Sequence, residues 1–275
     1  MAVVSKKAAE RISAGLGRFQ PILAAAKARD VNESDTVVIV TDMLQDVFGY
    51  DKYSDITSEH AVRGTYCDLA VKVEGSVALL IEVKAIGLDL KEQFVKQAVD
   101  YASNQGVEWV ALTNGARWQV YHVAFTKPIE KELVFDLDLL SINPRSSEQI
   151  ELLGLLAKEG WQKAQLEDYR SQKQALSRFI LGALLLSEPV LDVVRRELRR
   201  LSPDVRITCD EMRAALQADV VKREVLEGDK AEAARRQISK AAGRVLRASR
   251  GPSSDESVAE GPQGGGETPR TTPNE

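Results

Sequence analysis

Cysteine and histidine are scarce in this sequence, with two of each among 275 residues. Cys67 and Cys209 lie far apart without CxxC spacing, and His60 and His122 are isolated. We therefore expect no disulfide framework, no zinc cluster and no Ser-His-Asp triad. Each cysteine is expected to be a small, half-buried side chain.

Long apolar runs are also missing. The strongest apolar stretch, residues 179–186, is far shorter than the roughly 18 residues that a membrane span needs. Residues 1–29 are rich in alanine and lysine but lack the apolar core and cleavage pattern of a secretory signal. The sequence therefore predicts a cytoplasmic protein that makes no membrane contact.

An excess of positive charge is absent as well, since the formal net charge is −4. This argues against a protein that coats nucleic acid non-specifically, because such affinity comes mostly from many phosphate contacts. It does not exclude an enzyme that acts on nucleic acid, because net charge averages over the whole surface. The apolar content of 44% and the charged content of 28% are ordinary for a globular protein.

The N-terminal half alternates between helical and strand-like patterns. Helices are predicted at residues 5–29, 33–48 (with Asn32 as N-cap) and 90–104. Strands are predicted at residues 56–62, 66–73, 77–86, 107–113, 117–123 and 134–139. This order predicts an α/β fold, a mixed sheet flanked by helices.

After about residue 143 the pattern is helical throughout, with one or two helices over 148–186 and others over 189–201 and 210–221. Residues 222–250 are polar, alanine-rich and basic. Residues 251–275 are rich in Gly, Pro, Ser, Thr and Glu without apolar periodicity, so we expect disorder there. The predicted domains are 1–143, an all-helical region at 144–250 and a tail at 251–275.

A carboxylate and a lysine interrupt the most apolar predicted strand. Glu82 and Lys84 stand within the run LLIEVKAI and, being two residues apart, share one face of the sheet. Burying an unpaired carboxylate on such a face costs several kcal/mol. A partner for Glu82 is therefore expected.

Asp68 on the preceding strand is the candidate partner. With a three-residue turn at 74–76, Val73 pairs with Val77 and Asp68 stands directly opposite Glu82, with Cβ atoms roughly 4.5–5.5 Å apart. A two-residue turn would place the two acids on opposite faces unless a bulge corrected the register.

Two facing carboxylates would be unfavourable without a cation, and a bound Mg²⁺ ion removes that difficulty. The alternative is an ordinary ion pair of Lys84 with Glu82 or Asp68 on a solvated face. The apolar strand around Glu82 favours the metal site.

The stretches YCDLAVKVEGSVALLIEVKAIG, QAVDY and ALTNGARWQVYHV together resemble the N-terminal nuclease domain of type I restriction enzyme motor subunits. That domain belongs to the PD-(D/E)xK superfamily, and the resemblance covers residues 30–138. It implies a restriction-endonuclease-like fold, DNA as the partner and Mg²⁺ (with Mn²⁺ as a substitute) as the cofactor. Asp68, Glu82 and the Val83 carbonyl would then hold the metal, and Lys84 would orient or activate the attacking water.

The resemblance also implies three supporting residues. Gln97 and Tyr101 match the family's QxxxY motif and face one way on a helix, although they could equally be a simple surface pair. The family often adds a metal-site glutamate from an early helix. Glu33 matches it best and Glu59 is a rival, but Glu33 could serve only as a helix N-terminal acid.

Two features depart from the family pattern. Cys67 stands before Asp68 where the superfamily name implies proline, a substitution that is common there. No GxxxxGK[ST] motif occurs, so ATP-driven translocation is not expected. We expect a free-standing nuclease-like protein instead. Asn114-Gly115 is interpreted as a turn, and Trp118 and Tyr121 as packing residues rather than base-stacking groups.

The helical C-terminal region leaves its role open. An amphipathic helix at 189–201 has a valine and leucine stripe opposite Arg195, Arg196, Arg199 and Arg200. It could belong to a helical subdomain or to an interface between copies of the chain, or it could join residues 222–250 in a DNA-contacting arm. For the whole protein, the alternatives are a non-catalytic binding or regulatory protein with the nuclease fold, and a structural assembly protein.

Overall fold

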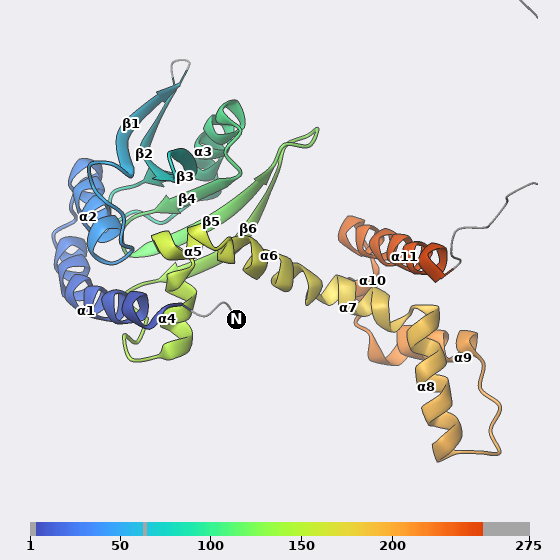
Figure 1. The fold of residues 1–275 in the computed structure, drawn as a ribbon. Helices are drawn as coiled ribbons and strands as arrows, with labels where there is room; N and C mark the ends of the chain where they lie inside the picture. The colour runs from blue at the N-terminus through green and yellow to red at the C-terminus, as the bar shows by residue number, and fades with distance from the viewer. Residues whose placement is uncertain (1–3, 63–64, 250–275) are drawn as a thin grey trace, which may run out of the picture. The chain divides into compact units, whose positions relative to one another are not determined.

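The computed structural model describes residues 4–62 and 65–249 (Figure 1). The chain divides into two compact units, Met1–Ala175 (the first unit) and Leu176–Glu275 (the second unit). The predicted disordered tail, 251–275, lies outside the described residues. Among the helices of the described segments, none has the length and apolar character that a membrane crossing requires.

The first unit combines helices with a single sheet. Its elements are α1 (Lys6–Ala28), α2 (Glu33–Asp46), β1 (Ile56–Val62), β2 (Thr65–Val73), β3 (Ser76–Val83), α3 (Glu92–Gln105), β4 (Trp109–Thr113), β5 (Arg117–Ala124), β6 (Glu130–Asp138), α4 (Ser147–Gly154), α5 (Lys158–Gln162) and α6 (Gln165–Ala175). Local signals position several of them. The Asn32 side chain caps α2 by accepting the Asp35 N–H, as predicted, and Gly106 ends α3 in the left-handed conformation.

The six strands lie side by side in chain order (Figure 1). Strands β3 and β4 are parallel, because α3 crosses between them, and all other neighbours are antiparallel. The sheet is therefore mixed and flanked by helices, which confirms the predicted fold class.

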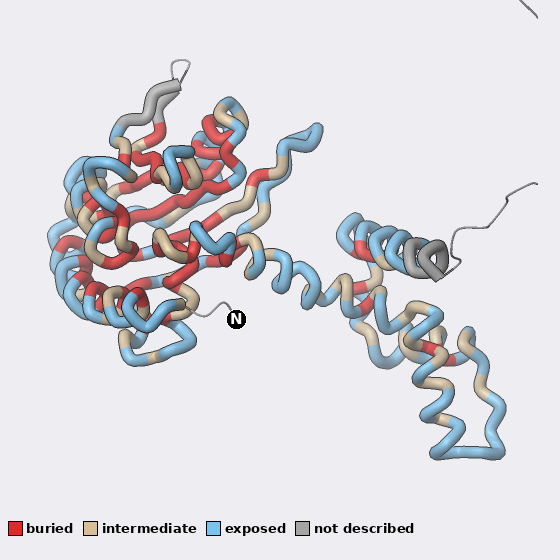
Figure 2. Tube along the Cα trace, in the orientation of Figure 1, coloured by how far each residue is buried: buried red, intermediate tan, exposed pale blue. Residues whose placement is uncertain are grey.

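Two hydrophobic clusters cover the two faces of this sheet. Alternate residues of β3 enter different clusters: Leu79 and Ile81 pack with α1 and α2, whereas Leu80 packs with α3. Trp118 is fully buried in the first cluster with its ring edge-on to Phe48, which agrees with its interpretation as a packing residue. Figure 2 shows how strongly burial concentrates in the sheet.

The hairpin between β2 and β3 differs from the predicted one. The turn has two residues, Glu74 and Gly75, both with positive φ (53° and 83°), as a type I′ turn requires. The predicted three-residue turn is therefore wrong. A register shift follows, because Lys72 pairs with Val77 but Val71 pairs with Leu79, which leaves Ala78 as a bulge.

The bulge restores the register that the predicted turn would have given. Leu69 pairs with Ile81, and continuing this register by one residue places Asp68 opposite Glu82. The two acids therefore share the face of the sheet that α3 covers.

The predicted helix over 148–186 is broken into α4, α5, α6 and α7 (Arg178–Leu185). Two local features accompany the later breaks: Ala164, between α5 and α6, has positive φ (51°), and Ser177 caps the start of α7. Gly160, inside α5, packs so close to the Gly154 carbonyl that a Cβ would not fit there.

Helices α4, α5 and α6 pack with the first unit. Arg11 of α1 donates two hydrogen bonds, of 2.7 and 2.8 Å, to Glu159 of α5, and Arg170 of α6 contacts Glu132 of β6. The sequence boundary at residue 143 thus lies inside the first unit. Whether 1–143 and 144–250 are domains in the folding sense stays a prediction.

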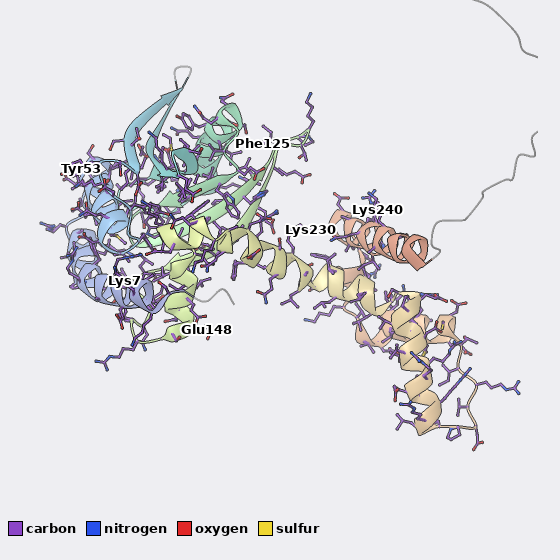
Figure 3. The ribbon with its side chains drawn as sticks, in the orientation of Figure 1. Lys7, Tyr53, Phe125, Glu148, Lys230 and Lys240 are labelled. Atoms are coloured by element: carbon purple, nitrogen blue, oxygen red, sulfur yellow. The ribbon has the colours of Figure 1, made fainter. Side chains whose placement is uncertain are left out.

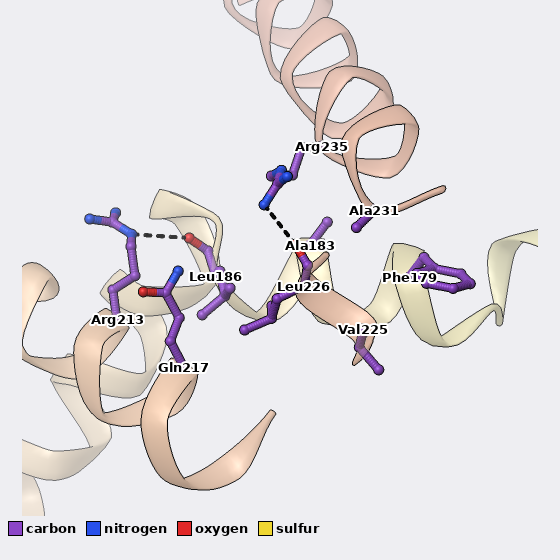
Figure 4. Close-up of a pocket in the computed structure, with 9 residues that line it drawn as sticks. All are labelled: Phe179, Ala183, Leu186, Arg213, Gln217, Val225, Leu226, Ala231 and Arg235. Carbon is purple, nitrogen blue, oxygen red and sulfur yellow. Dashed lines mark hydrogen bonds between the residues drawn. The ribbon is translucent and has the colours of Figure 1, made fainter. Parts of the chain in front are cut away.

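The second unit is entirely helical in its described part. Its elements are α7, α8 (Glu188–Leu201), α9 (Cys209–Ala215), the π-helical turn η1 (Leu216–Val220), α10 (Arg223–Leu226) and α11 (Asp229–Ser249). A small apolar pocket lies among α7, α10 and α11, with Phe179, Val225 and Ala231 in its lining (Figure 4).

Candidate active site

The candidate site lies at the carboxyl end of β3. Glu82 is 2% exposed and Lys84, just beyond the strand, is 9% exposed. The backbone of this segment is fixed by its parallel neighbour, because the Lys84 N–H donates to the Thr113 carbonyl at 2.8 Å. The same parity that puts Leu80 against α3 directs Glu82 to that face.

Asp68 reaches the same point from β2. Its Oδ2 accepts a hydrogen bond of 2.7 Å from the Val83 N–H. The N–H and C=O of one strand residue point toward the same neighbouring strand, so the Val83 carbonyl faces the Asp68 side as well. The strand end thus presents two carboxylates and a backbone carbonyl toward one region.

Lys84 stands among acids. Its Nζ lies 2.8 Å from Glu82 Oε1 and 3.4 Å from each carboxylate oxygen of Glu33, which is in the first turn of α2. The ammonium also lies 5.7 Å from the centre of the Phe94 ring on α3, a cation–π distance. Glu33, proposed from sequence alone, is therefore placed beside the lysine, while the side chain of its rival, Glu59, lies outside the described residues.

Charge and burial compete at this site. Burial raises the pKa of Glu82, and the neighbouring carboxylates of Asp68 and Glu33 raise it further against the lowering effect of Lys84. For Lys84, burial alone would lower the pKa, but the hydrogen bond to Glu82 and the surrounding acids raise it above its usual value. Three acids against one lysine leave an excess of negative charge, and the lysine stays protonated.

Cys67, next to Asp68, takes no part in this chemistry. Its thiol is 1% exposed and donates toward the Ile81 carbonyl at 3.2 Å. Burial, followed by the charge of Glu82, raises its pKa to about 12, so it is an unreactive thiol. Both cysteines are free, as the sequence predicts.

Gln97 and Tyr101 share α3 but not the same surroundings. Gln97 is exposed. Tyr101 is 2% exposed and packs in the α3 cluster with Cys67 and Leu80. The roles of the two residues stay a prediction.

Two contributors escaped the sequence interpretation. The Asn114 amide donates to the carbonyls of Ile86 (3.3 Å) and Leu88 (2.9 Å), and so ties the loop after Lys84 to the end of β4. Phe94 forms part of the lysine's surroundings. The sequence did contain a signal for Phe94, which lies three residues before Gln97 and therefore on the same side of the helix. Nothing in the sequence marks Asn114 as more than a turn residue.

The donor set fits a hard divalent cation. Carboxylate and carbonyl oxygens are the ligands that Mg²⁺ prefers, and one or two protein carboxylates suffice, because the ion keeps several waters. Among the described residues no three His, Cys, Asp or Glu side chains converge into a ready-made metal cluster. Glu82 instead holds the Lys84 ammonium, which offsets part of the negative charge that a cation would neutralise.

These features define a mixed α/β protein with an acid–lysine centre at the end of its central parallel strands. Residues 38–134 match the family described as type I restriction enzyme R protein N terminus. The chain therefore resembles the N-terminal domain of these R proteins, and the match fits a nuclease-like domain. No curated protein and no solved structure matched the chain.

The matched span contains most of the candidate site. It runs from α2 into β6 and includes Asp68, Glu82, Lys84 and both α3 residues, whereas Glu33 lies just before it. The family match therefore covers the part of the first unit that carries the acid–lysine centre.

Proposed function

We propose that the chain is a divalent-metal-dependent DNA endonuclease whose catalytic residues are Asp68, Glu82 and Lys84. The observation that carries this proposal is Glu82, a carboxylate 2% exposed in a central strand, with Asp68 opposite and Lys84 at 2.8 Å. A purely structural ion pair with Lys84 would need a single acid. This site has three acids, because Glu33 joins Asp68 and Glu82. The family match adds that the surrounding fold is nuclease-like.

In this proposal Asp68, Glu82 and the Val83 carbonyl hold Mg²⁺, or Mn²⁺ in its place. The ion supplies Lewis acidity, which stabilises negative charge on the scissile phosphate. The Val83 N–H orients Asp68 through its 2.7 Å hydrogen bond. Because the Asp68 carboxylate is held in one orientation, it would fix the position of the ion and of a phosphate bound to that ion.

Lys84 acts through its charge and its hydrogen-bond donors. Against the lowering effect of burial, the hydrogen bond to Glu82 and the surrounding acids raise its pKa, and as an ammonium it would orient or activate the attacking water. Glu82 and Glu33 hold the ammonium in place before an ion binds, and Glu33 would keep it there once Glu82 turns to the ion. Hydrolysis adds one water across a P–O bond, with the hydroxyl going to phosphorus and a proton to the departing oxygen. Gln97, exposed on α3, would position Lys84 or a phosphate, and the buried Tyr101 would act only by fixing α3 against the sheet.

The direct test is DNA cleavage in Mg²⁺ by the wild-type chain, Glu82→Gln and the control Glu74→Gln. The control makes the same chemical change at an exposed residue in the turn of the same hairpin. We expect Glu82→Gln to lose cleavage by roughly 10²–10³-fold and Glu74→Gln to keep it. Equal rates for wild type and a folded Glu82→Gln protein would refute the assignment.

The non-catalytic alternative is separated by calorimetry. A nuclease of this kind binds Mg²⁺ or Mn²⁺ through Asp68 and Glu82, so the binding heat should disappear in Glu82→Gln. A wild-type chain that binds DNA but neither ion would favour the binding protein instead.

A further inference from the structure

We infer that helix α11 of the second unit is a binding site for the phosphate backbone of double-stranded DNA. The helix carries six basic and two acidic residues, whereas the whole chain has a net charge of −4. From residue 233 to 249 it has no acid at all. This inference deepens the proposed DNA function and concerns a surface outside the acid–lysine centre.

Four of the six basic positions of α11 fall on one face of the helix, whereas Arg235 lies on the packed side and donates to the Leu226 carbonyl. Arg236 and Lys240 are four residues apart and exposed, and the sequence continues the spacing at Arg244 and Arg247, whose side chains lie outside the described residues. Figure 3 shows Lys230 and Lys240 on this helix. We call positions 236, 240, 244 and 247 the basic stripe.

The opposite face of α11 is occupied by its own unit. Ala231 and Ala234 are each 3% exposed, Ile238 is partly buried, and α11 packs against α7. This packing directs Arg236 and Lys240 away from the second unit's interior. The helix is therefore anchored with these two charges toward solvent.

The charges of Arg236 and Lys240 are available for a ligand. Lys240 has no ion pair within the described residues, and Arg236 has only the distant, exposed Glu232 at 3.9 Å, a contact of little energetic weight. Helix α8 differs, because its four arginines accompany three acids, and Arg195 and Arg200 each pair with an acid at 2.7 Å. Helix α8 has four basic residues against three acids, whereas α11 has six against two, so α11 carries the larger uncompensated charge.

The spacing of the stripe suits a regular polyanion. It covers roughly 16 Å along the helix, over which one strand of B-DNA presents about five phosphates. A membrane surface fits less well. A helix that lies in a membrane interface inserts an apolar face, whereas the corresponding face of α11 is mostly alanine and its first turns are buried.

The test measures binding of the full-length chain to a random 30-base-pair duplex in EDTA, as a function of salt. We compare wild type, Arg236→Gln/Lys240→Gln and a charge-matched control, Arg196→Gln/Arg199→Gln in α8, whose arginines are exposed. The α11 pair should lower the salt slope by about 2, one for each phosphate that the variant no longer neutralises, and weaken binding roughly tenfold at fixed salt. The control should change the slope by less than about 0.5.

Equal losses in both variants would overturn the inference, because net charge alone would then explain them. Tighter binding to vesicles with anionic lipid than to the duplex, lost in the α11 variant, would overturn it in favour of a membrane. Binding in EDTA requires no cleavage, so a failed nuclease test would leave this result readable. Conversely, loss of the α11 effect would leave the cleavage test of Glu82 standing.

Discussion

The two units bury their side chains to very different extents. In the described part of the second unit the buried hydrophobic residues are Leu191, Met212, Val225, Ala231 and Ala234, whereas the first unit has two extensive clusters on either side of a sheet. Large apolar side chains such as Leu176, Leu184 and Leu201 are 62%, 41% and 80% exposed. The contrast is visible in Figure 2.

This difference suggests that the two units have different roles. A buried carboxylate with a raised pKa is tolerated only where a rigid, well-packed framework holds it, and the first unit provides one around Glu82. The second unit has a thin core and exposed charge, which suit contact with a partner rather than precise chemistry. Exposed apolar residues on α7 and α8 also keep an interface between copies of the chain open as a proposal.

The largest contrast concerns Lys84. Lys84→Gln keeps a hydrogen-bond donor near Glu82 but removes the charge, so cleavage should fall by roughly 10²–10³-fold. The matched control is Lys72→Gln on β2 of the same hairpin, which should cleave like the wild type. Comparable losses in both variants, or none in Lys84→Gln, would place the chemistry elsewhere.

The second contrast compares the cores. Leu69→Ala removes a fully buried side chain of the first unit and should lower the free energy of unfolding by about 2–5 kcal/mol. Leu184→Ala, at a residue 41% exposed in α7, should cost less than about 1 kcal/mol. Urea unfolding followed by circular dichroism measures both. A larger cost for Leu184 would show that a partner or a second copy covers that leucine.

The third contrast uses two glycines, whose replacement by alanine should change stability in opposite directions. Gly106 ends α3 with φ of 70°, so Gly106→Ala should destabilise the first unit by about 1 kcal/mol. Gly243 lies inside α11 with open space around its Cα, so Gly243→Ala should stabilise that helix by about 0.5–1 kcal/mol. Melting temperatures that move in the same direction for both would contradict the helix assignment of residue 243.

The smallest expected effect tests whether α5 belongs to the first unit. The hydrogen bonds from Arg11 hold the pKa of Glu159 below its usual range. A lowered folded-state pKa contributes stability above the unfolded value, near 4.5, and this contribution is lost as the pH falls through the folded value. Glu159→Gln should therefore be slightly less stable than wild type at pH 7, and the gap should close below pH 4. A gap that persists in acid would show that charge is not its cause.

Much of the fold could be predicted because its signals are local. The alternation of apolar and polar residues predicted the strands, and Asn32 was predicted as the N-cap of a helix, which the structure confirms. The breaks in the predicted helix over 148–186 could not be predicted, because nothing in the sequence marks Ala164 as a residue with positive φ. The hairpin turn was predicted wrongly because a bulge at Ala78 lets a two-residue turn give the same register as a three-residue one, and turn length alone does not reveal a bulge.

The site was partly predictable. The proximity of Asp68, Glu82 and Lys84 followed from strand parity, and Glu33 followed only from the family resemblance. The surroundings of Lys84 also depend on where α3 and the β4 end lie, which explains why Phe94 and Asn114 were missed. The metal ion, its ligands and the roles of Gln97 and Tyr101 stay predictions.

A crystal of the chain grown with Mn²⁺ and measured at the manganese absorption edge tests the assignment most directly. The account predicts one anomalous peak bonded to the carboxylates of both Asp68 and Glu82, with the Lys84 ammonium displaced from Glu82. A protein that cleaves DNA in Mn²⁺ while its crystals show the metal bound elsewhere, and the Glu82–Lys84 contact intact, would contradict it.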